Sequence, residues 1–206
     1  MKIVSRDIFV FQEKDFFSPI RDKVDYARLL VLTARKLILN IEPASITATC
    51  SLKLIVDKMS RVFFYQEDKY FSVAFPFTTI VDRRGNITLT SYAGKRIDSK
   101  NISAVIAILD NVQFRLNPSL IDFYIDPNGI ESDGLFLLEE IFQFEPSYIR
   151  FDLDPVLQNG KLHPLNHLDI NYSQYSTYKL GLKETITKKY FENLQNINTE
   201  CSFVID

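Results

Sequence analysis

The amino-acid sequence predicts an α+β fold: a single domain over residues 1–206 with a mostly antiparallel sheet, flanked by an N-terminal and a C-terminal helix. Three observations lead to this prediction. Several short stretches alternate apolar and polar residues, as strands with one buried face do. Helical periodicity is clearest near the two ends of the chain. No linker-like tract, internal repeat or low-complexity segment marks a domain boundary.

The first half of the chain contains one predicted helix, which strands follow. Residues 24–41 place Val24, Val31 and Ile38 on one apolar stripe, and Pro43 ends the pattern. After this proline, apolar and polar residues alternate one by one, which predicts strands. The predicted strands cover residues 46–56, 62–66, 70–77 and both arms of a hairpin within 78–92, with Gly85 in its turn.

The second half mixes helices and strands. Helices are predicted over residues 102–109 and 134–144 and from Thr185 onward. Strands are predicted over residues 120–126, 147–154, 167–172 and 177–182. Asp98 or Ser99 can cap the first of these helices, and a turn at 127–129 closes the first of these strands. The last helix is expected to bury Tyr190 and Ile197.

The composition is that of an ordinary globular protein, with 46% hydrophobic and 24% charged residues. Phe and Tyr, at 17 and 10 residues, suit strands and aromatic cores. A net charge of −2 disfavours a general nucleic-acid coat protein but allows a local basic patch. Cys50 and Cys201 lie far apart, and the apolar alternation around Cys50 predicts a buried thiol rather than half of a disulfide.

The chain shows no pattern for export or membrane insertion. Charged residues interrupt the first seventeen residues, so a signal-peptide core is missing there. No apolar run reaches the length that spans a bilayer. These observations predict a cytoplasmic protein with no membrane association.

Both histidines of the chain, His163 and His167, lie within residues 150–171. The strands predicted on either side are joined through Asn159-Gly160, which favours an antiparallel hairpin over 147–172. Because alternate side chains of a strand share a face, the polar residues of both strands are expected on one surface. They are Tyr148, Arg150, Asp152, Asp154, His167, Asp169 and Asn171, and Lys179 on the next strand can join them.

This polar surface offers the groups that phosphodiester cleavage requires. An imidazole is the usual acid or base near neutral pH, a carboxylate can orient it, and a guanidinium or ammonium can bind phosphate. The candidate catalytic residues are His163, His167, Asp152 and Asp169, and the candidate phosphate-binding residues are Arg150 and Lys179. An alternative interpretation is an exposed face on which cross-strand ion pairs have only a structural role.

The same residue types also fit a site for Zn²⁺, Mn²⁺ or Mg²⁺. A His-x-x-x-His pair suits a metal when it lies on a helix. Pro164 and the strand from His167 disfavour a helix here, so His163 is placed in the loop. Extended geometry separates the two imidazoles, which converge only if the loop folds back. The sequence leaves the metal and any other cofactor undetermined.

The stretches PSYIRFDLDP and HPLNHLDINY, followed by a strand and KKYFENLQ, resemble the C-terminal signature of an uncharacterised bacterial protein family. In that signature an Arg-x-Asp strand precedes a His-Pro-x-x-His strand. The segment is also similar in outline to ribonuclease-like toxins of toxin–antitoxin pairs, which are typically encoded in mobile elements and phage-defence loci. The matching positions are Arg150, Asp152, His163 and His167, while Asp169 stands where many relatives have a second histidine.

Residues and resemblance together predict a bacterial defence or toxin–antitoxin effector that cleaves RNA or DNA through an Arg/Asp/His cluster. The alternative is a non-catalytic subunit or binding module of a multi-protein defence complex, whose Phe- and Tyr-rich strands contact a protein partner. The two hypotheses predict different surroundings for residues 150–171. An enzyme requires that these side chains converge, whereas a binding module allows them to point separately into solvent.

Overall fold

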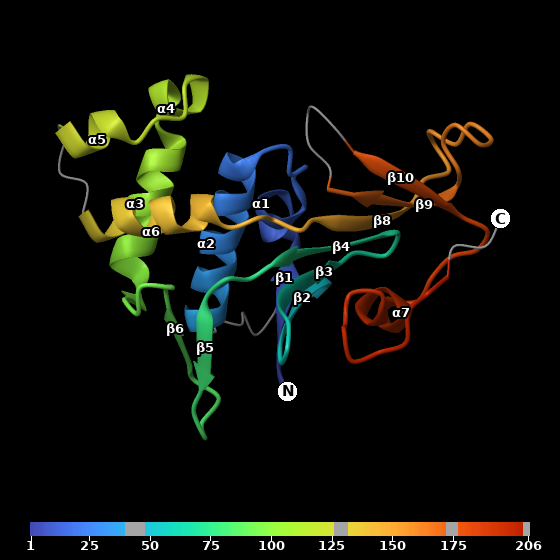
Figure 1. Cartoon of the computed structure of the whole chain (residues 1–206), viewed down its shortest axis with the longest axis horizontal. Coiled ribbons are helices and arrows are strands. Elements are labelled where there is room, and N and C mark those ends of the chain that lie inside the picture. Colours follow the sequence, from blue (N-terminus) through green and yellow to red (C-terminus); the bar gives the residue numbers. More distant parts are fainter. Residues whose placement is uncertain (40–47, 126–131, 172–176, 204–206) are drawn as a thin grey trace. The chain divides into compact units, whose positions relative to one another are not determined.

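The computed structural model describes residues 1–39, 48–125, 132–171 and 177–203. It confirms the α+β class and the mostly antiparallel sheet (Figure 1). The chain divides into two compact units, one formed by Met1–Phe11, Ile46–Ala74 and Ser147–Asp206 and the other by Gln12–Ser45 and Phe75–Pro146. Pro43, the turn at 127–129 and Tyr172 lie outside the described residues. No helix in the described ranges is long and apolar enough to cross a membrane.

The first unit contains a seven-stranded sheet, built from the two ends of the chain and a middle segment. Every neighbouring pair of its strands is antiparallel, in the order β1-β2-β3-β4-β8-β9-β10. The elements are β1 (Lys2–Phe9), β2 (Ala48–Val56), β3 (Ser60–Tyr65), β4 (Lys69–Ala74), β8 (Ile149–Leu153), β9 (Asn166–Ile170), β10 (Tyr178–Leu182) and helix α7 (Lys188–Asn193).

The second unit contains helices and a three-stranded sheet of order β5-β6-β7. The elements are α1 (Glu13–Phe17), α2 (Lys23–Leu39), β5 (Thr78–Val81), β6 (Ile87–Thr90), β7 (Arg96–Ile97), α3 (Ser99–Asp110), α4 (Val112–Leu116), α5 (Ile121–Ile125) and α6 (Ser132–Gln143), with a 3-10 turn η1 (Val10–Gln12) at the boundary between the units. Asp98 caps α3 as predicted, because its carboxylate accepts the backbone N–H groups of Lys100 and Asn101.

Two predicted elements are wrong in detail. Residues 120–125 of the strand predicted over 120–126 do not form a strand: the carbonyl of Leu120 accepts the N–H groups of Phe123 and Tyr124, which closes the helical turn of α5. The last helix starts at Lys188 rather than near Thr185, and it exposes Tyr190 instead of burying it. Ile197, also predicted to be buried, lies beyond the end of α7 and is 73% exposed.

An aromatic core lies between α7 and one face of the seven-stranded sheet. It is formed by Ile55, Phe63, Tyr65, Tyr70, Phe151, Leu168 and Phe191. Phe191 packs edge-on against Phe63 at 6.1 Å between ring centroids. Beside it, the buried carboxylate of Glu192 accepts hydrogen bonds from Tyr65 at 2.6 Å and Lys53 at 2.8 Å. The aromatic side chains of these strands therefore belong to the hydrophobic core. In β8 and β9 the residues that alternate with Phe151 and Leu168 point to the opposite face of the sheet.

Candidate functional site

The predicted hairpin is confirmed as the antiparallel pair β8–β9. Its register places Arg150 opposite Asp169 and Asp152 opposite His167. The neighbouring strands extend the row, because Lys69 of β4 pairs with Asp152 and Lys179 of β10 pairs with Asp169. Residues paired across an antiparallel ladder have side chains on the same face. Four adjacent strands thus contribute to one polar cluster, defined here as Lys69, Arg150, Asp152, His167, Asp169 and Lys179.

The centre of this polar cluster is buried, unlike an ordinary exposed strand face. Asp152, His167 and Asp169 are 7%, 1% and 1% exposed. Arg150 holds the two carboxylates, since its Nε donates to Asp152 Oδ2 and its Nη2 to Asp169 Oδ2, each at 2.5 Å. Two buried carboxylates need such a shared cation, because each charge loses its hydration. The arrangement fixes both aspartates in place.

His167 has a defined tautomer. Its Nδ1 lies 2.9 Å from the carbonyl oxygen of Pro164, which can only accept, so Nδ1 carries the hydrogen and donates it. In the neutral ring Nε2 therefore has a free lone pair. This lone pair lies on the side of the carboxylates, with Nε2 3.7 Å from Asp152 Oδ2. His167 is thus a buried base or ligand, and it is not accessible from solvent.

His163 lies at the edge of the cluster, in the loop that joins β8 and β9. Its Nε2 is 3.2 Å from Asp154 Oδ2, and its Nδ1 is 3.3 Å from Lys179 Nζ. An ammonium group only donates, so Nδ1 accepts from Lys179 and Nε2–H donates to Asp154. The result is a histidine that a carboxylate orients, with its basic nitrogen toward a lysine that is 41% exposed at its side chain.

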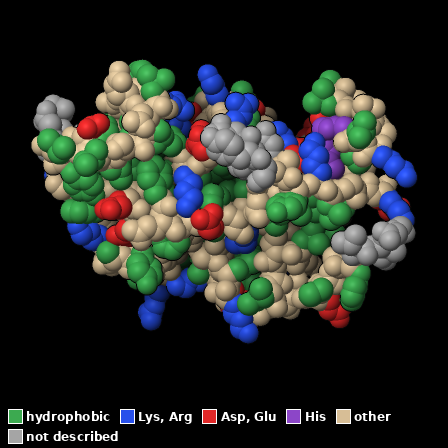
Figure 2. Space-filling view, turned by 45° about the horizontal axis from the view of Figure 1, so that its top comes forward, with side chains coloured by type: hydrophobic (Ala, Val, Ile, Leu, Met, Phe, Trp, Pro, Cys, Tyr) green, Lys and Arg blue, Asp and Glu red, His purple; other side chains and the backbone are tan. Residues whose placement is uncertain are grey.

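The two imidazoles lie together, with 4.6 Å between ring centroids, which is the outcome expected if the loop folds back. The connecting loop folds back on itself. Asp154 Oδ1 accepts the N–H groups of Val156 and Leu157, and a backbone bridge joins Asn159 to His163. The two histidines do not lie on a helix, as the presence of Pro164 between them led us to expect. Figure 2 shows the histidines beside lysine or arginine side chains on one face of the molecule.

Sequence reasoning missed Lys69 and assigned no specific role to Asp154 and Tyr148, which lie in the predicted polar row. Lys69 is far away in the sequence and joins only through the β4–β8 pairing. Asp154 belongs to the predicted polar row but was expected to have no role beyond it. Tyr148 is 4% exposed, and burial raises its pKa to about 12 although the charge of Arg150 opposes the rise. The phenol therefore stays protonated at neutral pH.

Asp154 gives the connecting loop a predictable pH dependence. The N–H of Leu157 and the imidazole of His163 lower the pKa of this carboxyl below its ordinary value of 3.8. A carboxyl whose pKa is lower in the folded state contributes stability above the unfolded value and loses it as the pH falls through the folded value. The Asp154→Asn variant is therefore expected to be slightly less stable than the wild type at neutral pH. Urea denaturation should show this difference vanish toward low pH; a difference that grew on acidification would contradict the assignment.

Three groups of the cluster have the composition of a metal site. One ligand atom each from Asp152, His167 and Asp169 lies within 4.8 Å of the other two. Asp169 Oδ1 is buried and accepts no hydrogen bond from any described residue. His163 is not part of this group, because both of its ring nitrogens have other partners.

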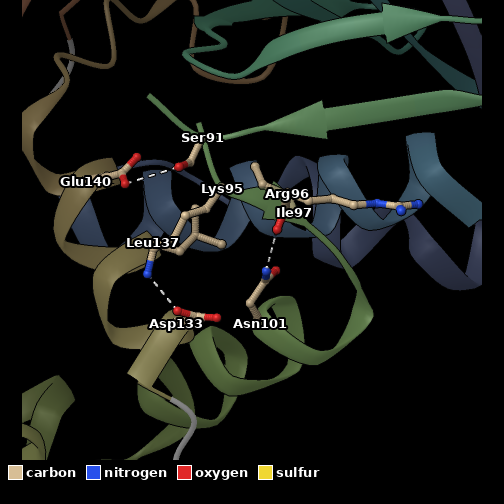
Figure 3. Close-up of a pocket in the computed structure, with 8 residues that line it drawn as sticks. All are labelled: Ser91, Lys95, Arg96, Ile97, Asn101, Asp133, Leu137 and Glu140. Atoms are coloured by element: carbon tan, nitrogen blue, oxygen red, sulfur yellow. Dashed lines mark hydrogen bonds and ion pairs between the residues drawn. The ribbon is translucent and has the colours of Figure 1, made fainter. Parts of the chain in front are cut away.

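A small cavity in the other unit does not have the features of a metal site (Figure 3). Its volume is ≈ 10 Å³, about the space for one water molecule. Its lining groups pair with one another: Lys95 with Asp133 at 2.7 Å, and Ser91 with Glu140 at 3.1 Å. This cavity is a packing feature between β7, α3 and α6 and has no room for a ligand.

Comparisons with protein-family models, with curated proteins and with solved structures find no match to this chain. The resemblance of residues 147–172 to a bacterial signature therefore remains a prediction.

Proposed function

We propose that the chain cleaves phosphodiester bonds in nucleic acid at the polar cluster and the neighbouring His163. The observation that carries the proposal is the position of His163, held by Asp154 and facing Lys179, directly beside a buried Arg/Asp/His group. An oriented imidazole next to a partly exposed cation, here Lys179, is the arrangement that general-base catalysis on an anionic substrate requires. The resemblance noted above extends the proposal to an effector of bacterial defence or toxin–antitoxin systems.

In this proposal His163 Nδ1 accepts the proton of the attacking hydroxyl, which is a water or an RNA 2′-hydroxyl. The oxygen forms a bond to phosphorus, the bond to the leaving oxygen breaks, and solvent supplies the proton that this oxygen needs. Asp154 keeps the ring in the tautomer that has a basic Nδ1, because it accepts the Nε2 hydrogen. Lys179 moves from His163 to a non-bridging phosphate oxygen.

The charges around the site support an anionic substrate. Lys69, Arg150 and Lys179 face the carboxylates of Asp152 and Asp169, so three cations meet two anions within the cluster. Arg150 is committed to the two carboxylates. The phosphate contact predicted for it therefore passes to Lys69 and Lys179, whose side chains are 38% and 41% exposed. Asp154 beside His163 balances the third cation, so the phosphate contact rests on these two partly exposed lysines and not on a net positive charge.

The test is a cleavage assay of the purified chain on single- and double-stranded RNA and DNA oligonucleotides. Lys179→Ala is expected to raise KM about 10-fold, because a charge-assisted contact to phosphate is lost. Lys183→Ala is the matched control: Lys183 is an exposed lysine that directly follows β10. Equal effects of the two substitutions would contradict a specific role for Lys179, and absence of cleavage on all four substrates would reject the proposed function.

A second candidate function is partner binding through the helical unit. Large apolar side chains are exposed along α4 and α5. They are Val112, Leu116, Ile121 and Ile125, each more than 60% exposed. Such side chains are typical of a protein-binding surface. This function predicts that Leu116→Asp and Ile125→Asp abolish association while any cleavage activity continues.

A further inference from the structure

We infer that Asp152, His167 and Asp169 bind one divalent cation of the Mn²⁺ or Zn²⁺ type. The inference deepens the proposed function, on which it rests only for the use of the ion in cleavage. Two carboxylates and one imidazole form a mixed oxygen and nitrogen ligand set, which first-row divalent metals accept. All three side chains are at least nine-tenths buried, so the ligands are held before the ion arrives.

Asp169 Oδ1 is a buried oxygen with an unmet need for a positive partner. This atom is buried and has no hydrogen-bond donor among the described residues, while Oδ2 of the same carboxylate is bound by Arg150 at 2.5 Å. A buried carboxylate oxygen without a donor is costly. Lys179 Nζ lies 4.0 Å from this oxygen, too far for a hydrogen bond. A metal ion at this position removes the deficit.

Hydrogen bonds to their other atoms orient the three ligand side chains. Metal-binding histidines usually donate the other ring N–H to a carbonyl or carboxylate, which fixes the free nitrogen. His167 does this through Nδ1 to Pro164. Arg150 does the equivalent for the aspartates, since it binds Oδ2 of each and leaves Asp169 Oδ1 without a donor among the described residues. The guanidinium thus acts as a positioning residue for both carboxylates.

The spacing requires the ligand atoms to move closer together. Ligand atoms about 2.1 Å from one metal ion are roughly 3.0–3.4 Å apart at octahedral or tetrahedral angles. The three ligand atoms lie within 4.8 Å of one another, so separations wider than those of a bound ion close when it binds. Rotation of a carboxylate about its last torsion provides this movement without any change in the strands.

The two lysines of the cluster compete with the ion for the carboxylates, which gives a specific test of the inferred metal site. Lys69 Nζ is 3.9 Å from Asp152 Oδ1 and Lys179 Nζ is 4.0 Å from Asp169 Oδ1, so both ammonium groups are close to the oxygens that the ion needs. Like charges repel, and the ion must displace these groups toward solvent. Removal of Lys179 is therefore expected to strengthen metal binding although it weakens binding of an anionic substrate.

Isothermal titration of the full chain with Mn²⁺ tests the inference. We expect one ion per chain, affinity at least about 10-fold lower in Asp169→Asn and His167→Gln, and affinity about 3- to 10-fold higher in Lys179→Ala. Lys183→Ala, at an exposed lysine directly after β10, should bind as the wild type does. No binding by the wild type, or binding that Asp169→Asn and His167→Gln leave unchanged, would overturn it. Circular dichroism in chelator shows that each variant is folded, and the two ligand variants provide independent tests.

Cleavage measurements separate this inference from the proposed function. If the wild type binds Mn²⁺ but cleaves no nucleic acid, the metal site stands and the proposed function fails. If it cleaves equally in chelator and in Mn²⁺ and titration shows no binding, the function stands and the metal site fails. Loss of cleavage in chelator with recovery on addition of Mn²⁺ supports both.

Discussion

Replacement of His163 by alanine is expected to lower the rate of phosphodiester cleavage by about 10²- to 10⁴-fold, the usual contribution of a general base. The structural cost should be small, because His163 is in a loop and contacts Asp154 and Lys179 only at the edge of the cluster. Steady-state kinetics on the preferred oligonucleotide measure the effect. The loss should appear in kcat, with KM nearly unchanged, because Lys179 still binds phosphate.

The control for this variant is Asn159→Ala in the same loop. Asn159 is exposed and reaches His163 through backbone hydrogen bonds, which alanine retains. This variant should therefore cleave at close to the wild-type rate. If His163→Ala retained the wild-type kcat, the base would have to be a different residue and the proposed role of the Asp154–His163 pair would be wrong.

Replacement of Arg150 by methionine is expected to lower the free energy of unfolding by about 3–5 kcal/mol. The substitution leaves Asp152 and Asp169 buried near each other without the guanidinium that binds both. Unpaired buried charges of the same sign are among the most costly single changes in a protein. Urea denaturation at neutral pH measures the loss, and acidification should reduce it because protonated carboxyls no longer repel each other.

A compensating variant separates charge from packing in this prediction. Arg150→Met combined with Asp152→Leu and Asp169→Leu removes all three charges together and should recover most of the lost stability, since apolar side chains of similar size often replace a buried ion cluster. If the single Arg150→Met substitution cost less than about 1 kcal/mol, the cluster would be well hydrated and the burial argument would fail.

Much of the fold could be predicted because local patterns agree with the tertiary structure. Alternation identified β2, β3, β4, β8, β9 and β10, and helical periodicity identified α2, α3 and α6. Strand β1 was missed because charges at Lys2, Arg6 and Asp7 interrupt its alternation and only pairing with β2 defines it. Residues 120–125 were misassigned because the apolar run is too short for its period to distinguish helix from strand.

The row of polar residues on β8 and β9 could be predicted, but its burial could not. Strand parity fixes which side chains share a face and gives no information on what covers that face. Lys69 was not predictable because β4 joins β8 across a long sequence separation. The approach of His163 to His167 depends on the turn that Asp154 and the Asn159 bridge form, and short turns of this kind have no strong periodic signal.

Cleavage by the His163→Ala variant, measured beside the wild type and Asn159→Ala at matched folded concentration, tests the central claim most directly. This variant removes the imidazole and leaves the strands, the buried carboxylates and the surface lysines in place. The account predicts that the wild type cleaves an RNA or DNA oligonucleotide and that the folded His163→Ala variant is about 10²- to 10⁴-fold slower. A folded His163→Ala variant that cleaves as fast as the wild type, or a wild type that cleaves neither RNA nor DNA, would contradict it.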